Sequence, residues 1–328
     1  MPGQPDIPVC PVIVGPTAGG KSALSIAVAH TFESRGLNAE IVSADSVQIF
    51  RGMDIGSAKP TPDEMAGIPH HLIDVVDPED RFTVHDWLAA AERAVEQIRA
   101  RNAVPIVVGG TNLYIKAFME GLFEGPEPDA AVRAELQSLP QADRRAELER
   151  VDPAAAERIH PNDERRTVRA LEVYRQTGVP ITEHQQQWDR GARPDAALFG
   201  IRWEPDALTR RINARVRLMM EQGLLAEVDS LKDRLGPQAR EALGYKQLLA
   251  HLAGDIPLED AVERIKIETR RFAKNQRTWL RRLAAVSANN PRSGWFSGGA
   301  ISGDPQQPIK SAESIVDACL QPLEGGRE

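Results

Sequence analysis

Residues Gly15 to Ser22, which read GPTAGGKS, have the composition and spacing of a loop that binds phosphate groups. The pattern G-x-x-x-x-G-K-[ST] works because small residues let successive backbone N–H groups converge on an anion at the N-terminus of a helix. Lys21 adds a positive charge, and the hydroxyl of Ser22 can hold a hydrated Mg²⁺ ion. Such loops are typical of ATP-binding and other nucleotide-binding proteins. The motif predicts phosphate binding but does not name the reaction.

The acidic partner of this loop has two candidate positions. A nucleotide kinase or NTPase carries an acidic metal partner after an apolar strand, which points to Asp74 or Asp77 at the end of HLIDVVD. Asp45, in SADSVQ, follows a different apolar run and would lie among ligands of the loop. A carboxylate there would hold the water shell of a metal or act as a general base. The structural alternative for Asp45 is that it caps a turn or a helix.

The loop needs a strand before it and a helix after it, and the flanking sequence predicts both. Residues 9–15 (VCPVIVG), 39–46 (AEIVSADS) and 104–111 (VPIVVGGT) read as buried parallel strands. Residues 21–31 and 84–101 carry apolar side chains at helical spacing. Alternating strands and helices predict an α/β fold, a P-loop NTPase-like parallel sheet flanked by helices, with ligands at the carboxyl ends of the strands.

The remaining pattern predicts four segments. Residues 1–120 form the first part of the core, and 121–196, which begin with the turn-rich GLFEGPEPD, form a helical insertion domain. Residues 197–287 return to the core with a strand at 197–203 and two long amphipathic helices, 208–235 and 258–283. In the second helix a core-facing seam is expected at Ile265, Phe272, Trp279 and Leu283. Residues 288–328 are expected to be a Gly/Pro-rich tail, mostly a loop or linker, with a short helix.

Composition limits the function classes. The net charge of −7 argues against indiscriminate binding to polyanions, yet eight Lys or Arg and one acid, Glu268, between Arg264 and Arg282 give a local charge of +7. Cys10 and Cys319 lie far apart in sequence, so we expect neither a disulfide framework nor a zinc site. No apolar run has the length of a membrane span, and the first residues lack the features of a signal peptide. We therefore expect a cytoplasmic protein.

Eight segments, in this order, resemble motifs of the tRNA dimethylallyltransferase family, also called tRNA isopentenyltransferase. They are GPTAGGKS, SADSVQIFRGMDIGSAKP, GIPHHLIDVVDP, VVGGTNLYIKAF, IHPNDERRTVRALEVYRQTG, RINARVRLMMEQGLLAEV, EALGYKQLL and TRRFAKNQRTWLRR. The resemblance runs from about residue 9 to residue 282 and suits the bacterial type. Phe50 stands where the family often has Tyr, and Ser57 stands where it often has Thr.

The resemblance implies a Mg²⁺-dependent prenyltransferase. It would move the dimethylallyl group of dimethylallyl diphosphate to N6 of adenosine 37, next to the anticodon of tRNA, and release diphosphate. Asp45 would be the general base, and Thr17 and Arg215 would contact the diphosphate. The whole diphosphate cradle would be Gly15, Pro16, Thr17, Ala18, Gly19, Gly20, Lys21 and Ser22, with Ser22 as the metal ligand. A monomer is expected.

The same resemblance implies which residues contact tRNA, with the insertion domain gripping the anticodon stem loop. They are Asp45, Ser46, Val47, Gln48, Thr111, Arg133, Arg165, Arg166, Thr167, Val168 and Arg169. Gln48 carries a donor and an acceptor on one amide, which suits an adenine edge. Without the resemblance, each arginine would read as an ordinary solvated helix residue.

Two other functions are compatible with the sequence. The first is a P-loop kinase of a nucleoside or small metabolite, in which the insertion is a lid. The second is a non-catalytic RNA-binding protein with a vestigial loop. Transfer of a prenyl group, turnover of ATP without transfer, or RNA binding with neither would separate the three functions.

Overall fold

The computed structural model describes residues 8–122, 125–185, 193–287, 290–298 and 307–321. The chain forms two compact units. One unit combines Met1–Met119 with Arg193–Glu328, and the other is Glu120–Ala192. We call them the α/β unit and the helical unit and describe each by itself.

The α/β unit is built on one sheet of six parallel strands in the order β3-β2-β4-β1-β5-β6. The strands are β1 (Cys10–Val14), β2 (Ala39–Ala44), β3 (His70–His71), β4 (Val104–Gly109), β5 (Ala196–Arg202) and β6 (Gly294–Ser297). β1 lies between β4 and β5 and is buried along its whole length, as its apolar sequence predicts. The predicted parallel α/β fold is therefore confirmed.

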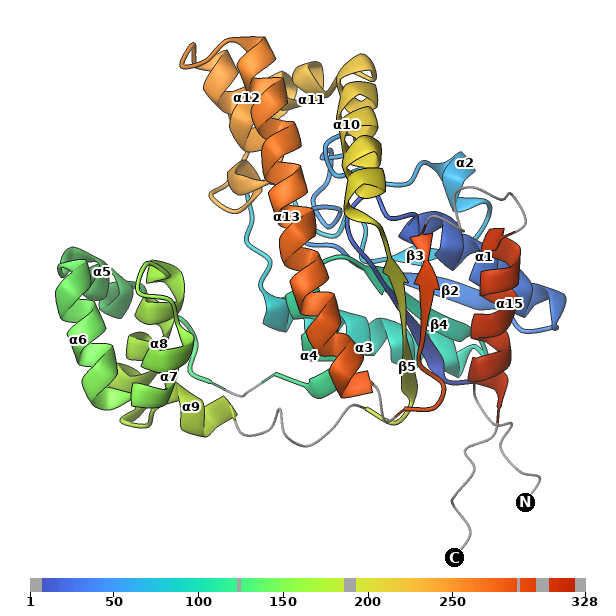
Figure 1. Ribbon diagram of the computed structural model, residues 1–328, viewed down its shortest axis with the longest axis horizontal. Coiled ribbons are helices and arrows are strands. Elements are labelled where there is room, and N and C mark those ends of the chain that lie inside the picture. Colours follow the sequence, from blue (N-terminus) through green and yellow to red (C-terminus); the bar gives the residue numbers. More distant parts are fainter. Residues whose placement is uncertain (1–7, 123–124, 186–192, 288–289, 299–306, 322–328) are drawn as a thin grey trace, which may run out of the picture. The chain divides into compact units, whose positions relative to one another are not determined.

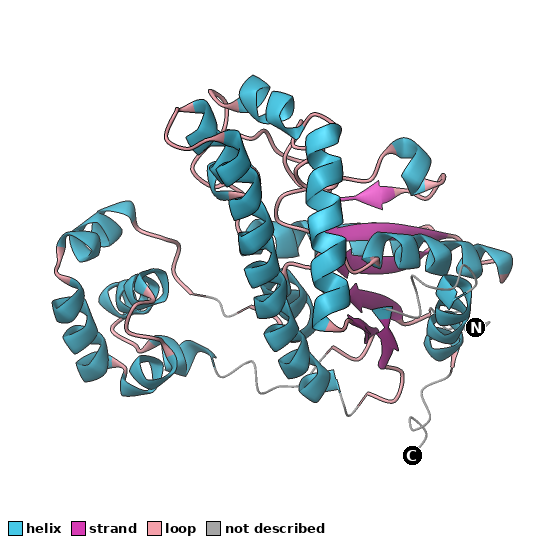
Figure 2. Ribbon diagram, turned by 45° about the horizontal axis from the view of Figure 1, so that its top comes forward, coloured by secondary structure: helices cyan, strands magenta, loops and turns pink. Residues whose placement is uncertain are grey.

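Helices cover both faces of this sheet (Figures 1 and 2). They include α1 (Lys21–Ser34), α3 (Val84–Ala100), α4 (Asn112–Glu120) and the C-terminal α15 (Gln307–Leu320). α1 packs against α15, and Leu24 and Phe32 of α1 join Ile315 of α15 in the same buried apolar cluster. Cys10 and Cys319 are both buried and free. No helix among the described residues is long and apolar enough to cross a membrane.

A second apolar cluster lies above the carboxyl ends of the strands. It is formed by α10 (Pro205–Glu221), α11 (Leu224–Leu231), the 3₁₀ turn η2 (Ala239–Glu241), α12 (Tyr245–Leu252) and α13 (Leu258–Ser287), with the loop after β2. The prediction of one helix over 208–235 was wrong. Gly223 has φ 100° between α10 and α11, a left-handed conformation that ends one helix and starts another.

The core-facing seam of α13 also differs from the prediction. Phe272 is 42% exposed and Trp279 is half-buried, whereas Ile265 and Leu283 are buried as expected. The buried positions are Ala261, Ile265, Thr269, Ala273, Gln276, Leu280 and Leu283, which follow steps of three and four. The prediction missed this seam because it includes two polar residues, Thr269 and Gln276.

The C-terminal tail is more ordered than its composition suggests. Residues 294–297 form β6, which pairs in parallel with β5 from Phe199 to Arg202 and becomes the edge of the sheet. The expectation of a loop or linker over this segment was wrong. A Gly- and Ser-rich run was sufficient for an edge strand because the neighbouring strand supplies the hydrogen-bonding partners.

The helical unit contains α5 (Ala130–Ser138), α6 (Gln141–Val151), α7 (Pro153–Arg158), α8 (Glu164–Thr177) and α9 (Ile181–His184). Three of its helices begin at an aspartate, Asp129, Asp152 or Asp163, whose carboxylate accepts hydrogen bonds from the first backbone N–H groups. Its core is apolar and includes Leu136, Leu148 and Leu171.

Candidate active site

The phosphate loop joins β1 to α1 and leaves the N-terminus of α1 open. Gly20, the residue before the helix, has φ 85°, and Ala18 is also left-handed, with φ 58°. No side chain caps α1, and its first turn has no acidic residue. The first N–H groups of a helix have no partner within the helix and carry a partial positive charge. This end of α1 is therefore suited to an anion.

Two carbonyl groups of the loop accept hydrogen bonds from side chains outside the loop. Nε of Arg211 donates to the carbonyl of Ala18 (2.8 Å), and Nε1 of Trp203 donates to the carbonyl of Gly19 (3.1 Å). The guanidinium of Arg211 also lies 4.7 Å from the centre of the Trp203 ring. The loop conformation is thus fixed by Trp203, which directly follows β5, and by Arg211 of α10, without using the N–H groups at the start of α1.

Two cations face the loop without a carboxylate bonded to either. Nζ of Lys21 donates to the carbonyl of Pro16 (3.0 Å), and Nη2 of Arg215 donates to Oγ1 of Thr17. Among the described residues neither cation forms an ion pair within 4 Å, and the buried Nε of Arg215 has no acceptor. Burial lowers the pKa of Lys21 to about 8 and also lowers the pKa of Arg215, while the charge of Asp45 opposes both shifts. A bound anion would supply the missing negative charge.

Asp45 combines the two roles that the sequence left open. Its Oδ1 accepts hydrogen bonds from the backbone N–H groups of Val47 (2.9 Å) and Gln48 (3.3 Å), so the residue does cap the turn after β2. No partner of Oδ2 is found in the part of the chain that the structure describes. One oxygen therefore fixes the carboxylate, and the other is available to a ligand.

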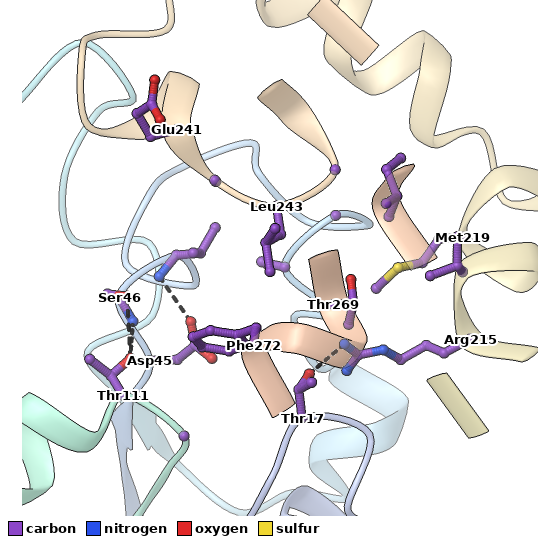
Figure 3. A pocket seen from close by; sticks show the side chains of 18 of the residues that line it. Thr17, Asp45, Ser46, Thr111, Arg215, Met219, Glu241, Leu243, Thr269 and Phe272 are labelled. Carbon is purple, nitrogen blue, oxygen red and sulfur yellow. Dashed lines mark hydrogen bonds between the residues drawn. The ribbon is translucent and has the colours of Figure 1, made fainter. Parts of the chain in front are cut away.

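These residues line two adjoining cavities at the carboxyl edge of the sheet. The larger has a volume of about 360 Å³, and the smaller, over the phosphate loop, has about 160 Å³. Five residues line both: Thr17, Lys21, Asp45, Ser57 and Arg215. In the larger cavity the side chains of Asp45, Arg215 and Phe272 come from separate elements (Figure 3). Its wall is mostly apolar away from the loop, with Phe50, Val216, Met219, Leu224, Leu243 and Ile265.

Gly109 and Gly110 explain why β4 ends without an acidic residue. A Cβ on Gly109 would lie 2.1 Å from the carbonyl oxygen of Ala44, and one on Gly110 would lie 2.6 Å from Nε2 of Gln276. The Gln276 side chain fills this space and connects the end of β4 to the phosphate loop. Its Nε2 donates to the Gly110 carbonyl (2.8 Å), and its Oε1 accepts from the N–H of Thr17 (2.8 Å). α13 is thereby fixed to the phosphate loop.

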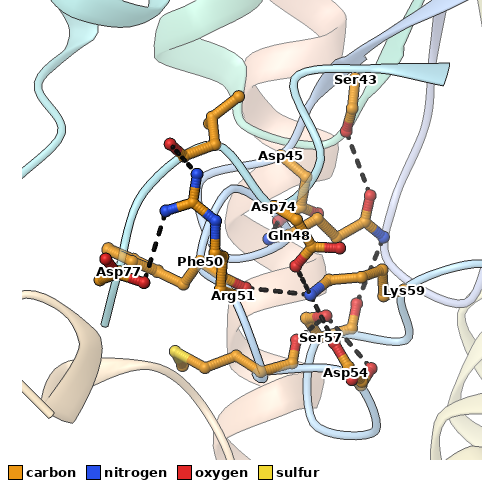
Figure 4. A network of polar contacts seen from close by, with 12 residues as sticks. Ser43, Asp45, Gln48, Phe50, Arg51, Asp54, Ser57, Lys59, Asp74 and Asp77 are labelled. Atoms are coloured by element: carbon orange, nitrogen blue, oxygen red, sulfur yellow. Dashed lines mark hydrogen bonds and ion pairs between the residues drawn. The ribbon is translucent and has the colours of Figure 1, made fainter. Parts of the chain in front are cut away.

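Lys59 holds the loop that carries Asp45. Its side chain is 6% exposed, and Nζ contacts the carboxylates of Asp54 and Asp74 and the carbonyl of Phe50 (Figure 4). Asp77 pairs with Arg51 at the surface (3.4 Å). Neither Asp74 nor Asp77 lines the two cavities. The acidic metal partners that a P-loop kinase would require are therefore not at the phosphate loop.

Glu227 holds the opposite end of the same loop. Its carboxylate accepts hydrogen bonds from the N–H groups of Asp54 (3.0 Å), Ile55 (2.7 Å) and Gly56 (3.0 Å) and from the hydroxyl of Tyr245. Gly56 is required here, because a Cβ would lie 2.4 Å from the Tyr245 ring. Gly56 lines the larger cavity, so Glu227 and Tyr245 fix part of its wall.

The residues present fit a magnesium ion that is shared with a substrate. Within the described ranges, no group of three or more His, Cys, Asp or Glu residues has the arrangement of a metal site. Mg²⁺ commonly takes only one or two protein ligands and completes its shell with water and substrate phosphate. Ser22 is exposed at the start of α1, and it lines the smaller cavity together with Asp45.

Comparison with known proteins agrees with this geometry. The model of the IPP transferase family matches residues 48–283. This chain belongs to the IPP transferase family. It is 45% identical over 317 residues to the tRNA dimethylallyltransferase of Desulforudis audaxviator, a match that covers 94% of this chain and 97% of the other. The tRNA dimethylallyltransferase of Bacillus subtilis is 42% identical, covering 84% and 88%.

Two solved structures extend the family comparison. One is the tRNA isopentenylpyrophosphate transferase of Bacillus halodurans, with a TM-score of 0.67, 36% identity, and coverage of 95% of this chain and 96% of that one. The other is a eukaryotic dimethylallyltransferase acting on tRNA, with a TM-score of 0.80, 28% identity, and coverage of 97% and 81%. The family resemblance inferred from the sequence is confirmed.

The structure brings together most of the site residues that the sequence singled out in the α/β unit. Ser46, Val47 and Thr111 line the larger cavity, and Oγ1 of Thr111 accepts a hydrogen bond from the N–H of Ser46 (3.0 Å; Figure 3). Gln48 lines the smaller one, but its amide is already engaged. Its Oε1 accepts from Ser43, and its Nε2 donates to the carbonyls of Ser57 and Ala58.

The predicted RNA-binding residues of the helical unit fall into three kinds. Arg133 and Arg169 pair with Glu172, whose side chain is fully buried. Thr167 and Val168 are themselves buried. Arg165 and Arg166 are exposed. The role of all six positions in RNA binding stays a prediction.

Sequence reasoning missed Gln276, Glu227 and the exposure of Phe272. For Gln276 a signal was present, since a glutamine at a core-facing position of α13 needs hydrogen-bonding partners. For Glu227 no local signal exists, because the backbone N–H groups that it binds lie more than 170 residues earlier in the chain.

Proposed function

We propose that this chain transfers a dimethylallyl group from dimethylallyl diphosphate to N6 of adenosine 37 of tRNA, next to the anticodon, and releases diphosphate. The observation that carries the proposal is the pair of cations, Lys21 and Arg215, that face an uncapped helix N-terminus without a bonded carboxylate. The names of the relatives and the family membership support the same reaction. We propose further that it acts as a monomer.

The donor would occupy both cavities. Its diphosphate would lie in the smaller one, against Gly15–Ser22, with Lys21 and Arg215 neutralising its charge. Its five-carbon group would reach the apolar wall of the larger one, near Val216 and Met219. When bound, Mg²⁺ would supply further charge neutralisation of the leaving group, held by Ser22 and substrate oxygens.

The acceptor would enter the larger cavity as an extruded base. Extrusion of a base costs a few kcal/mol and is least costly in a loop. The N6 nitrogen would form a bond to C1 of the prenyl group while the bond from C1 to the diphosphate oxygen breaks. The N6 proton would pass to Oδ2 of Asp45, the oxygen that the turn does not use. Thr17 would orient Arg215 and the diphosphate through its hydroxyl.

The direct test is incubation of the purified protein with unmodified tRNA, labelled dimethylallyl diphosphate and Mg²⁺. We expect label in the nucleoside from position 37 and release of diphosphate. In a parallel incubation with ATP, hydrolysis or transfer of its γ-phosphate without prenyl transfer would instead identify a P-loop kinase or NTPase. RNA binding with neither activity would contradict the proposal equally.

The role of Asp45 has its own test. Asp45→Asn keeps the shape of the side chain and removes its basicity, so we expect the transfer rate to fall by roughly 10²–10⁴-fold. The affinity for tRNA should stay within a few fold. Asp77→Asn is the matched control, because Asp77 forms a surface ion pair away from both cavities. A wild-type rate for Asp45→Asn would remove this carboxylate from the chemistry.

A further inference from the structure

A third cavity lies where β5 and β6 end beside α13, and it shares no residue with the two cavities above the phosphate loop. We call it the β5–β6 cavity. Its volume is about 520 Å³, which exceeds that of the larger reaction cavity. Three arginines and three aromatic residues line it: Arg202, Arg277, Arg281, Trp203, Trp295 and Phe296.

The tail of the chain builds one wall of this cavity. Trp295 and Phe296 belong to β6, which lies beyond the region that the family model matches. Two glycines, Gly200 in β5 and Gly298 directly after β6, leave room for the indole rings of this cavity. A Cβ on Gly200 would lie 2.1 Å from the Trp295 ring, and one on Gly298 would lie 2.0 Å from the Trp203 indole. These two glycines let the indoles lie directly against the backbone.

The cavity carries excess positive charge. Its one acidic residue is Glu204, and none of its three arginines has an ion pair or hydrogen bond to any residue that the structure describes. Arg202 lies over the Trp295 ring, with its guanidinium carbon 4.6 Å from the ring centre. Some arginines elsewhere are paired, for example Arg193 with Glu92 and Asp195. Unpaired arginines beside half-buried aromatic rings are typical of surfaces that bind single-stranded nucleic acid.

The β5–β6 cavity is connected to the reaction site through two elements. Gln276, which holds the phosphate loop, directly precedes Arg277 on α13, and Arg281 lies about 6 Å beyond Arg277 along the helix. Trp203 donates a hydrogen bond to the Gly19 carbonyl of the phosphate loop and also lines the cavity. A strand of RNA that delivers one base to the reaction cavity would therefore have neighbouring nucleotides close to these arginines.

We propose that the β5–β6 cavity binds an unpaired nucleotide of the tRNA substrate, adjacent in the strand to the modified adenosine. Arg277 and Arg281 contact its phosphate, and Trp295, with Arg202, provides a stacking surface for its base. The proposal rests on the proposed function, because it takes the RNA substrate from it. It assigns an RNA-binding role to the C-terminal strand of this chain.

The test measures the dissociation constant of an RNA hairpin with the anticodon stem and loop at several salt concentrations. Trp295→Ala should weaken binding by roughly 5- to 100-fold, and Trp295→Phe should retain most of the affinity. Arg281→Ala should weaken it less and lower the slope of log affinity against log salt by about 0.7. A hairpin with the same stem and a tight tetraloop should not distinguish these variants from the wild type.

Controls separate this proposal from a folding defect and from the proposed function. Arg93→Ala, an exposed position on α3, should bind RNA as the wild type does, and pyrophosphate affinity should be unchanged in every variant. If Trp295→Ala has a lower melting temperature than the wild type, the RNA affinity of the double variant Arg202→Ala and Arg281→Ala, at two exposed positions, tests the proposal instead.

Two outcomes would contradict one proposal without the other. If the wild type transfers prenyl groups and the cavity variants bind RNA as tightly as Arg93→Ala does, this inference alone is overturned. A wild type that binds the hairpin without prenyl transfer would overturn the proposed function, while loss of hairpin binding in the variants would still support the cavity as an RNA site.

Discussion

Arg215 of the α/β unit has the opposite electrostatic environment to Arg133 and Arg169 of the helical unit. Arg215 has no acceptor for its buried Nε and no bonded carboxylate among the described residues. Arg133 and Arg169 of the helical unit share the buried carboxylate of Glu172, which also accepts from the N–H of Asp129. An uncompensated, partly buried cation is costly unless a ligand supplies the opposite charge, whereas a compensated one stabilises the fold. The sequence alone shows only arginines in both places.

Replacement of Arg215 should break this comparison most strongly. Arg215→Met keeps the apolar stem and removes the charge, so we expect kcat/KM for prenyl transfer to fall by roughly 10²–10³-fold. The free energy of unfolding should stay the same or rise, because the removed charge has no carboxylate partner among the described residues of the free protein. Arg217→Met, exposed on the same helix, is the control and should leave both quantities unchanged. A large loss of stability with little loss of activity would mean that Arg215 is structural.

Replacement of Glu172 should have the opposite pattern. Glu172→Ala leaves Arg133 and Arg169 without their partner, so we expect the helical unit to lose about 2 kcal/mol of stability in urea unfolding. Both arginines are partly exposed, so water can hydrate them when Glu172 is removed, and this hydration limits the loss of stability. Glu149→Ala removes an exposed pair with Arg145 and should change stability by less than about 0.5 kcal/mol. Equal effects of the two variants would show that Glu172 is no special anchor.

The pH dependence of anion binding tests whether Lys21, like Arg215, is a cation without a carboxylate partner in the free protein. The protonated amine binds the anion, so affinity is full below the pKa of about 8 and is lost as the pH rises through it. We expect the affinity for pyrophosphate to fall about five-fold between pH 8 and pH 9. Lys21→Arg stays charged over this range and corrects for the ionisation of pyrophosphate itself. If the pyrophosphate affinities of the wild type and of Lys21→Arg changed in parallel with pH, the lowered pKa of Lys21 would be contradicted.

The smallest expected effect concerns the exposed arginines of the helical unit. Arg165→Ala should raise the dissociation constant of tRNA by a few fold and lower the salt slope by about one, with unchanged stability. Arg150→Ala, exposed on α6, is the matched control. If the two variants behave alike, Arg165 is an ordinary solvated residue and not an RNA contact.

The local parts of the fold were predictable, since each depends on a short stretch of sequence. The apolar runs before Gly15 and around Ile41 and Ile106 predict the strands, and the phosphate loop predicts where ligands gather. The break at Gly223 was missed because a single glycine is tolerated in an amphipathic pattern and only the backbone conformation shows the helix end.

The long-range parts were not predictable in the same way. β6 forms because β5, about 95 residues earlier, supplies its partners, and its own composition is that of a loop. The environment of Gln276 on α13 is set by Thr17 and by the end of β4, and Phe272 of the same helix lines the larger cavity. The sequence was thus sufficient to predict which residues lie at the site. It was not sufficient to predict which of them already form hydrogen bonds within the protein and which are available to a ligand.

The central claim is that the N-terminus of α1, with Lys21 and Arg215, holds the diphosphate of the prenyl donor. Its most direct test is a crystal structure of the protein with Mg²⁺ and a thio analogue of dimethylallyl diphosphate that cannot react. We expect diphosphate oxygens within hydrogen-bond distance of the backbone N–H groups of Gly20 to Ser22 and of the Arg215 guanidinium, with the prenyl carbons toward Met219. A diphosphate bound at any other surface, with these N–H groups left to solvent, would contradict the account.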